Sequence, residues 1–202
     1  MHTVIVGGGA SGIAVAVMLL RHAQHGDQVT HIDPAPHVGM GVAYSTPDET
    51  LLLNVRVSNM SIYADAPSHF ADWVARQYDH HDTNAFVPRH WYAQYLRDTL
   101  ASAIRTSAGH YTQIQAQACD IEPHQRIVLL QDGQRVVADH VVLALGHAPS
   151  ANPLQRWVAQ PRRVIAGYDW QGIAREIAPH QPVIIVGTGL TMVDAVSMLW
   201  KS

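Results

Sequence analysis

Hydrophobic positions along the chain follow two periods, and together they predict alternating strands and helices. Residues 2–7 (HTVIVG) form a short, β-branched apolar run that predicts a buried strand ending at glycine. From Ser11 to about His25 the apolar positions have helical spacing, and residues 28–33 (QVTHID) predict a second strand. A strand, a helix and a strand in this order predict an α/β fold with a parallel sheet.

The middle of the chain predicts helices first and strands afterwards. Residues 38–67 are punctuated by Gly, Ser and Pro and indicate an ordered loop region that covers a ligand. Residues 69–78 and 86–104 have helical spacing, with Pro88 near the second helix start. Alternation from Tyr111 onward, with an Asp-Gly turn, predicts an inserted antiparallel β-meander around 111–137. The predicted strands are residues 111–123, 126–131 and 134–138, followed by a buried strand at 139–146.

Composition excludes several classes of partner. The chain has 202 residues, 48% of them hydrophobic, and a formal net charge of −3 with scattered Lys and Arg, which argues against a nucleic-acid-binding surface. No apolar run reaches the length of a membrane span, so no membrane partner is expected. Cys119 is the single cysteine, which indicates a cytoplasmic protein and predicts a buried thiol. The 14 histidines lack zinc-site spacing, and no metal is expected.

The first predicted strand leads into a dinucleotide-binding fingerprint. Gly7, Gly9 and Gly12 fall in G-x-G-x-x-G register: Gly7 permits a tight turn, Gly9 lets a pyrophosphate approach, and Gly12 allows close helix packing. Ser11 begins the helix, whose free N–H groups attract phosphate. Asp33 follows Gly12 by 21 residues, where an acid accepts hydrogen bonds from ribose hydroxyls. Small residues that serve packing alone are the alternative, and the motif does not separate NAD from FAD.

A second, less complete fingerprint lies near the end of the chain. Residues 182–200 (PVIIVGTGLTMVDAVSMLW) predict a strand ending at Gly187, then Gly189 and a helix. Met192 takes the third motif position, so an ordinary strand–helix turn is the alternative. Two fingerprints indicate two nucleotides, one donating electrons to the other. Because a βαβ unit takes about 30 or more residues, we expect the chain to be the N-terminal part of a longer protein or a truncated gene product.

These residues resemble the flavoproteins that have two dinucleotide-binding domains. Residues 141–150 (VVLALGHAPS) are similar to the strand ending in Ala-Thr-Gly that joins the two domains, with Leu145 in place of threonine. The segment from VGMGVAY to LLNV, with FVPRHWYAQYL, is similar to bacterial FAD-NAD(P)-binding proteins that include a proposed urate hydroxylase. A more distant resemblance joins the chain to flavin-containing monooxygenases and amine N-hydroxylases.

The resemblance implies a role for each candidate residue. The first fingerprint would hold FAD and the second would hold NAD(P)H. Asn54 corresponds to an asparagine near the flavin ring, although a loop asparagine that closes a turn is an equal alternative. Arg89 would neutralise a phosphate or cap a surface. The implied cofactor-binding residues are Gly7, Gly9, Ser11, Gly12, Asp33, Asn54, Gly146, Gly187 and Gly189.

The implied organisation is a Rossmann-like FAD-binding domain with the inserted meander (1–150), a linker (151–181) and the beginning of an NAD(P)-binding domain (182–202). The implied function is an FAD-dependent, NAD(P)H-using oxidoreductase that resembles monooxygenases and acts on a small molecule. The alternatives are a redox-sensing module without turnover and an FAD-only oxidase or dehydrogenase. Catalytic residues, substrate, oligomeric state and activity of the 202-residue chain by itself stay open.

Overall fold

A parallel sheet forms the centre of the structure. The computed structural model describes residues 1–147, 165, 175–178 and 180–200. The central sheet has the strand order β3-β2-β1-β7, and a separate antiparallel sheet has the order β4-β5-β6. The parallel strands are β1 (His2–Val6), β2 (Gln28–Asp33), β3 (His110–Gln115) and β7 (His140–Leu143). The antiparallel strands are β4 (Ala118–Glu122), β5 (Ile127–Leu130) and β6 (Arg135–Val137).

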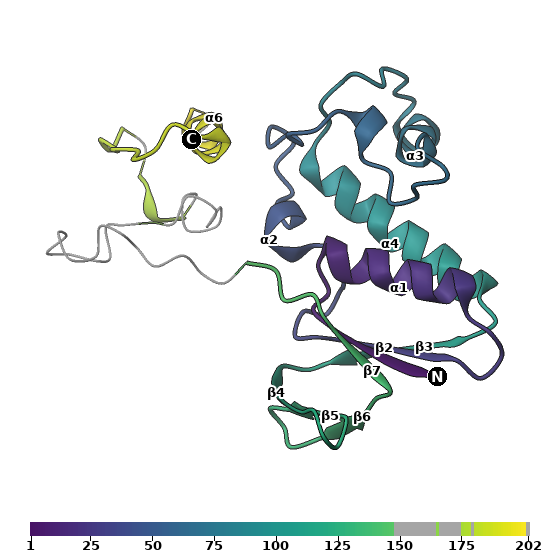
Figure 1. Ribbon diagram of the computed structural model, residues 1–202. Coiled ribbons are helices and arrows are strands. Elements are labelled where there is room, and N and C mark those ends of the chain that lie inside the picture. Colours follow the sequence, from purple (N-terminus) through teal and green to yellow (C-terminus); the bar gives the residue numbers. More distant parts are fainter. Residues whose placement is uncertain (148–164, 166–174, 179, 201–202) are drawn as a thin grey trace, which may run out of the picture.

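Helices cover one face of the parallel sheet and the antiparallel sheet covers the other (Figure 1). The helices are α1 (Ala10–His22), α2 (Gly41–Tyr44), η1 (Val57–Asn59), α3 (His69–Tyr78), α4 (Arg89–Thr106) and α6 (Leu190–Leu199). Helix α1 connects β1 to β2, and α2, η1, α3 and α4 lie between β2 and β3. This arrangement confirms the predicted α/β class, a Rossmann-like parallel sheet with an inserted antiparallel meander.

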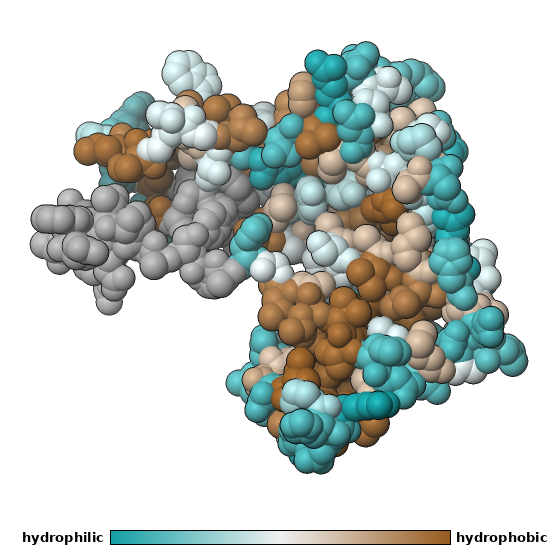
Figure 2. Space-filling view, viewed as in Figure 1, coloured by the Kyte–Doolittle hydropathy of each residue, from teal (hydrophilic) through white to brown (hydrophobic). Residues whose placement is uncertain are grey.

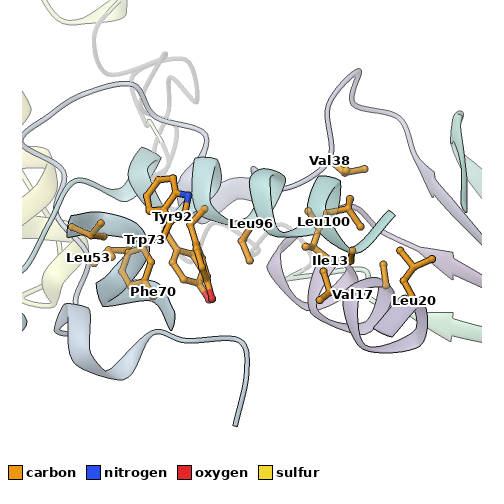
Figure 3. Close-up of a cluster of buried hydrophobic side chains, with 14 of the residues drawn as sticks. Ile13, Val17, Leu20, Val38, Leu53, Phe70, Trp73, Tyr92, Leu96 and Leu100 are labelled. Carbon is orange, nitrogen blue, oxygen red and sulfur yellow. The ribbon is translucent and has the colours of Figure 1, made fainter. Parts of the chain in front are cut away.

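The central strands carry apolar side chains on both faces because both faces are packed. On one face Ile5 and Val29 belong to the cluster that α1 and α4 cover. On the other face Val4, Val6 and Ile32 pack against the antiparallel sheet. Full burial of each such side chain stabilises the fold by about 1.5–3 kcal/mol. The close-up in Figure 3 shows how α1 and α4 meet, and its labelled residues are Ile13, Val17, Leu20, Val38, Leu53, Phe70, Trp73, Tyr92, Leu96 and Leu100.

The meander is shorter than the sequence predicts. It begins at Ala118, whereas the segment from His110 to Gln115 is β3 and pairs in parallel with β2 along its whole length. Strand β3 is the edge strand of its sheet, and four of its six residues are exposed, with only Tyr111 and Ile114 half-buried. This edge strand lacks the continuous buried run that is typical of a central parallel strand, which is why the prediction assigned it to the meander.

Cys119 is exposed, so the predicted buried thiol is wrong. The pairing of β4 with β5 shifts register between Ala118 and Asp120, which places Cys119 at a β-bulge. A bulge leaves its extra residue outside the ladder and breaks the alternation of inward and outward side chains. The alternating sequence pattern is therefore misleading at this position.

The predicted strand ahead of Gly187 is absent from the described residues. Residues 183–186 have no regular secondary structure, and Ile184 is 90% and Val186 72% exposed. A strand needs a neighbour to pair its N–H and C=O groups, and neither sheet of the described residues contains this segment. Most of the predicted linker, residues 151–181, lies outside the described residues.

Candidate dinucleotide-binding site

Three predicted site residues meet at one edge of the parallel sheet. Gly7 directly follows β1, Asp33 ends β2, and Gly146 follows β7 by three residues. Because these strands are parallel neighbours, with Val6 in register with Ile32 and Leu143, their carboxyl ends lie side by side. Ligands of open α/β sheets bind at this edge, at the point where the strand order reverses.

Gly7 and Gly12 serve the packing of sheet and helix. Gly7 has a φ of 109°, a conformation that glycine adopts readily, and its N–H donates to the Ile32 carbonyl at 2.9 Å. A Cβ on Gly7 would overlap the Ala144 carbonyl oxygen, and a Cβ on Gly12 would overlap the Gly7 carbonyl oxygen. Side chains at these two positions would therefore push β7 or α1 away from the turn.

Gly9 differs from these two glycines because its missing side chain faces open space. A Cβ there would meet no atom within 4 Å. Gly9 is the N-cap of α1, without a side-chain cap or an acidic residue in the first helical turn. Ser11, in that first turn, is exposed. The backbone N–H groups at the N-terminus of α1 are thus accessible to an anion, and the helix dipole favours one.

Asp33 holds the glycine turn through Gly8, a residue that the motif leaves unspecified. The Oδ2 atom of Asp33 accepts a hydrogen bond from the Gly8 N–H at 2.5 Å, and Oδ1 accepts one from the Ala35 N–H at 2.8 Å. A Cβ on Gly8 would lie 2.8 Å from Val38 Cγ1 and 2.9 Å from Asp33 Cγ. Sequence reasoning missed Gly8, although the run of three glycines was a signal that the middle residue also needs to be small.

His31 is the second residue of the turn that sequence reasoning missed. Its side chain is fully buried, and Nε2 lies 2.9 Å from the Gly7 carbonyl oxygen. A carbonyl only accepts, so Nε2 carries the proton, and Nδ1 accepts from the Tyr111 hydroxyl at 3.3 Å. Burial lowers the pKa of His31, while the Gly7 hydrogen bond and the charge of Asp33 oppose this effect. Burial raises the pKa of Tyr111 to about 12, so its hydroxyl keeps its proton.

Apolar side chains are exposed next to this edge. Leu143, the last residue of β7, is 57% exposed, and Leu145 is 66% exposed. Figure 2 shows a broad apolar area between the helical layer and the antiparallel sheet. An apolar surface beside an uncapped helix N-terminus suits a ligand that combines phosphates with a flat aromatic ring.

Asn54 and Arg89 are two candidate site residues that do not belong to the glycine turn. Asn54 is exposed, and among the described residues it forms no hydrogen bond with Gly7, Gly9 or Asp33. Arg89 begins α4, donates from Nε to the Leu52 carbonyl at 2.9 Å, and pairs through Nη2 with Asp194 at 2.6 Å. These contacts favour a structural role for Arg89 over the suggested contact with a phosphate.

The second glycine turn has the backbone geometry of the first. Gly187 has a φ of 124°, close to the 109° of Gly7. Gly189 caps α6 with φ −80° and ψ −179°, and Gly9 caps α1 with φ −73° and ψ −176°. The two turns therefore present their helix N-termini in the same way, although the strand that should precede Gly187 is absent from the described residues.

A parallel sheet, a glycine turn at its carboxyl edge and an acid at the end of β2 define a Rossmann-like dinucleotide-binding domain. The chain belongs to the FAD-NAD(P)-binding family, whose model matches residues 4–148, more than half of the chain. FAD and NAD(P)H are the cofactors of this family of oxidoreductases, and the resemblance inferred from the sequence is confirmed.

Individual proteins show the same likeness. The chain is 27% identical over 197 residues to the hydrogen cyanide synthase subunit HcnB of Pseudomonas protegens, covering 94% of this chain and 34% of HcnB. The chain thus spans about a third of the length of this curated relative. Cyclohexanone monooxygenase matches with a TM-score of 0.49 at 17% identity, covering 75% of this chain and 27% of its own. The S-allyl-L-cysteine S-oxygenase of Allium sativum matches with a TM-score of 0.49 at 19% identity, covering 72% of this chain and 36% of the oxygenase chain.

Among the described residues, no helix has the length and apolar character to cross a membrane.

Proposed function

We propose that the turn between β1 and α1 binds the pyrophosphate of FAD and that Asp33 binds the adenosine ribose. The observation that carries this proposal is the contrast between the glycines. Protein atoms fill the Cβ directions of Gly7, Gly8 and Gly12, whereas the Cβ direction of Gly9 is open beside an uncapped helix N-terminus. Packing explains the first three glycines, whereas at Gly9 the absence of a side chain leaves room for a ligand to approach the backbone.

Asp33 keeps the capacity to bind a ribose while it holds Gly8. A carboxylate offers about four acceptor positions, and the Gly8 and Ala35 N–H groups use one on each oxygen. The remaining positions at the sheet edge can accept from ribose hydroxyls. The exposed Leu143 and Leu145 lie along the same edge and would shield the apolar part of the ligand from water.

We further propose that the turn at Gly187 and Gly189 binds NAD(P)H and that the protein to which this chain belongs is a monooxygenase-like oxidoreductase acting on a small molecule. FAD held at the first turn would supply two-electron chemistry, from the hydride of NAD(P)H to oxygen or another acceptor. The matching geometry of the two glycine turns supports a second nucleotide. In this scheme the described residues bind and orient the two nucleotides, and none is assigned a proton-transfer role.

FAD titration tests the first site and keeps the alternatives apart. The chain and its Gly9→Val variant are titrated with FAD, and binding is followed by flavin fluorescence. We expect saturable binding to the native chain and a loss of binding in the variant, with both proteins equally folded by circular dichroism. Equal binding by both proteins would contradict the site. Addition of NADH or NADPH to the FAD complex then separates a NAD(P)H-using protein from an FAD-only one, since only the former would bleach the flavin absorbance.

The similarity to HcnB supports a second candidate role, that of one subunit in an oxidoreductase assembly. HcnB is named as a subunit of a synthase, and this chain matches about a third of it. Co-purification from the native host, followed by mass measurement of the intact complex, tests this role. A single species with the mass of one polypeptide would contradict it.

A further inference from the structure

One peptide unit of the glycine turn is held at both ends by side chains of β2. The Gly7 carbonyl and the Gly8 N–H belong to the same planar peptide and point in opposite directions. His31 Nε2 donates to the carbonyl at 2.9 Å, and Asp33 Oδ2 accepts from the N–H at 2.5 Å. His31 and Asp33 are two residues apart on β2, so their side chains leave the strand on the same face, toward α1.

We propose that His31 is a positioning residue of the dinucleotide site and that it works with Asp33 as a clamp on the Gly7–Gly8 peptide. The inference rests on the proposed binding of FAD at this turn. Rotation of that peptide would redirect the chain leading to Gly9, and with it the first N–H groups of α1. By preventing this rotation, the two side chains keep the donors of the turn aimed at the phosphates before a ligand arrives.

The surroundings of His31 favour a neutral ring with one defined tautomer. The ring is fully buried, and its Nε2 lies 3.0 Å from the position that a Cβ on Gly12 would take. The Tyr111 hydroxyl donates to Nδ1 from the neighbouring strand β3, and the two rings meet edge to face at 6.3 Å between centroids. Tyr111 therefore directs the imidazole proton to Nε2, where the Gly7 carbonyl needs a donor.

A hydrophobic residue would fill this buried position equally well if packing alone were required. The adjacent position on β1, Ile5, lies on the same face and is apolar and fully buried. A polar ring at position 31 has a desolvation cost unless it is hydrogen-bonded. His31 meets this condition through the glycine turn and through Tyr111, which ties its presence to the turn.

Three variants distinguish a hydrogen-bond donor from packing. His31→Leu removes the donor, and His31→Gln restores a donor amide at a similar reach. His69→Leu is the matched control, since His69 pairs with the Tyr95 hydroxyl at 2.9 Å but is the first residue of α3, away from the glycine turn (Figure 1). We expect His31→Leu to weaken FAD binding by roughly threefold to tenfold, the range of one net hydrogen bond. His31→Gln should recover most of that loss, and His69→Leu should bind FAD like the native chain.

Two ligand-free measurements complete the test. Nitrogen NMR of the native chain should show His31 protonated at Nε2, and hydrogen exchange at the Gly8 amide should accelerate in His31→Leu but not in His31→Gln or His69→Leu. If His31→Gln and His31→Leu weaken FAD binding equally and accelerate hydrogen exchange at the Gly8 amide equally, His31 serves packing. That result would overturn the clamp. If the native chain does not bind FAD, the proposed function fails, and the Gly8 exchange rates alone decide whether the clamp exists.

Discussion

Arg89 in the first turn of α4 and Asp194 in α6 form an ion pair across 105 positions of sequence, with 2.6 Å between Nη2 and Oδ2. Both side chains are mostly shielded, with 16% and 12% of their surfaces exposed. Beside the pair, Leu51 and Ala195 belong to one small apolar cluster. The helix that follows the second glycine turn is therefore attached to α4 and to the segment around Leu51 by a charge pair and an apolar contact.

The two partners of this pair should not be equally sensitive to substitution. Burial raises the pKa of Asp194, and Arg89 opposes this effect. Arg89→Met leaves a shielded carboxylate without this partner, whereas Asp194→Asn removes the charge that burial disfavours. We expect Arg89→Met to weaken the attachment of α6 by about 1.5–3 kcal/mol, the range for hydrogen bonds to charged groups. Asp194→Asn should weaken it less.

Hydrogen exchange followed by mass spectrometry measures this attachment directly. Peptides from residues 190–199 should exchange faster in Arg89→Met, while peptides from α1 should keep their native rate and serve as the internal reference. Faster exchange in both regions would mean that Arg89 stabilises the whole domain. Unchanged exchange at 190–199 would show that the ion pair does not hold α6.

Substitution of Gly9 and of Gly12 should separate binding from folding. Alanine at Gly9 meets no protein atom, so the free energy of unfolding should stay within about 1 kcal/mol of the native value, the difference between Gly and Ala in chain entropy. Alanine at Gly12 overlaps the Gly7 carbonyl and should cost about 1–3 kcal/mol, as overpacking does. Urea unfolding measures both values. A strongly destabilised Gly9→Ala would show that the residue serves packing after all.

Asp33→Ala should weaken FAD binding and loosen the turn together. The variant loses the acceptor for the Gly8 N–H and the proposed acceptor for ribose, and each charge-assisted hydrogen bond contributes about 1.5–3 kcal/mol. Isothermal titration with FAD should therefore show an affinity at least about tenfold lower, since 1.4 kcal/mol corresponds to a factor of ten. Exposed Asp132, in the turn between β5 and β6, offers the matched control, and Asp132→Ala should leave the affinity unchanged.

Sequence pattern predicted where the residues of the first glycine turn lie better than it predicted the second half of the fold. The spacing of Gly7, Gly12 and Asp33 was sufficient to place them at one sheet edge, because strand and helix lengths determine where each element ends. The assignment of β3 failed because this edge strand, with four of its six residues exposed, lacks the buried apolar run that is typical of a parallel strand. Pattern also cannot show pairing between strands, which decides whether an apolar segment such as 183–186 forms one.

The role of His31 was out of reach of the sequence for a different reason. Its residue type fits any strand, and its significance depends on the direction of one carbonyl, that of Gly7. That direction follows from the unusual backbone conformation of Gly7, which neighbouring residues impose and which no periodicity encodes. Arg89 is a similar case, since its partner Asp194 lies in a separate segment that only the three-dimensional structure brings close.

The stability of the chain should depend on pH through His31. Because burial lowers the pKa of His31 in the folded chain, the unfolded chain binds a proton more readily. The stabilising contribution is therefore complete above about pH 6.5, the ordinary pKa of histidine, and is lost as the pH falls toward the lowered value of the folded chain. Urea unfolding between pH 8 and pH 5 measures the effect as the difference between the native chain and His31→Gln. The native chain should lose more stability than the variant over this range.

His69, whose pKa is lowered by burial and by Arg76, should contribute separately, so the effects of His31→Gln and His69→Gln should add. Parallel stability curves for the native chain and His31→Gln would show that the folded chain accepts a proton on His31 as readily as the unfolded chain does.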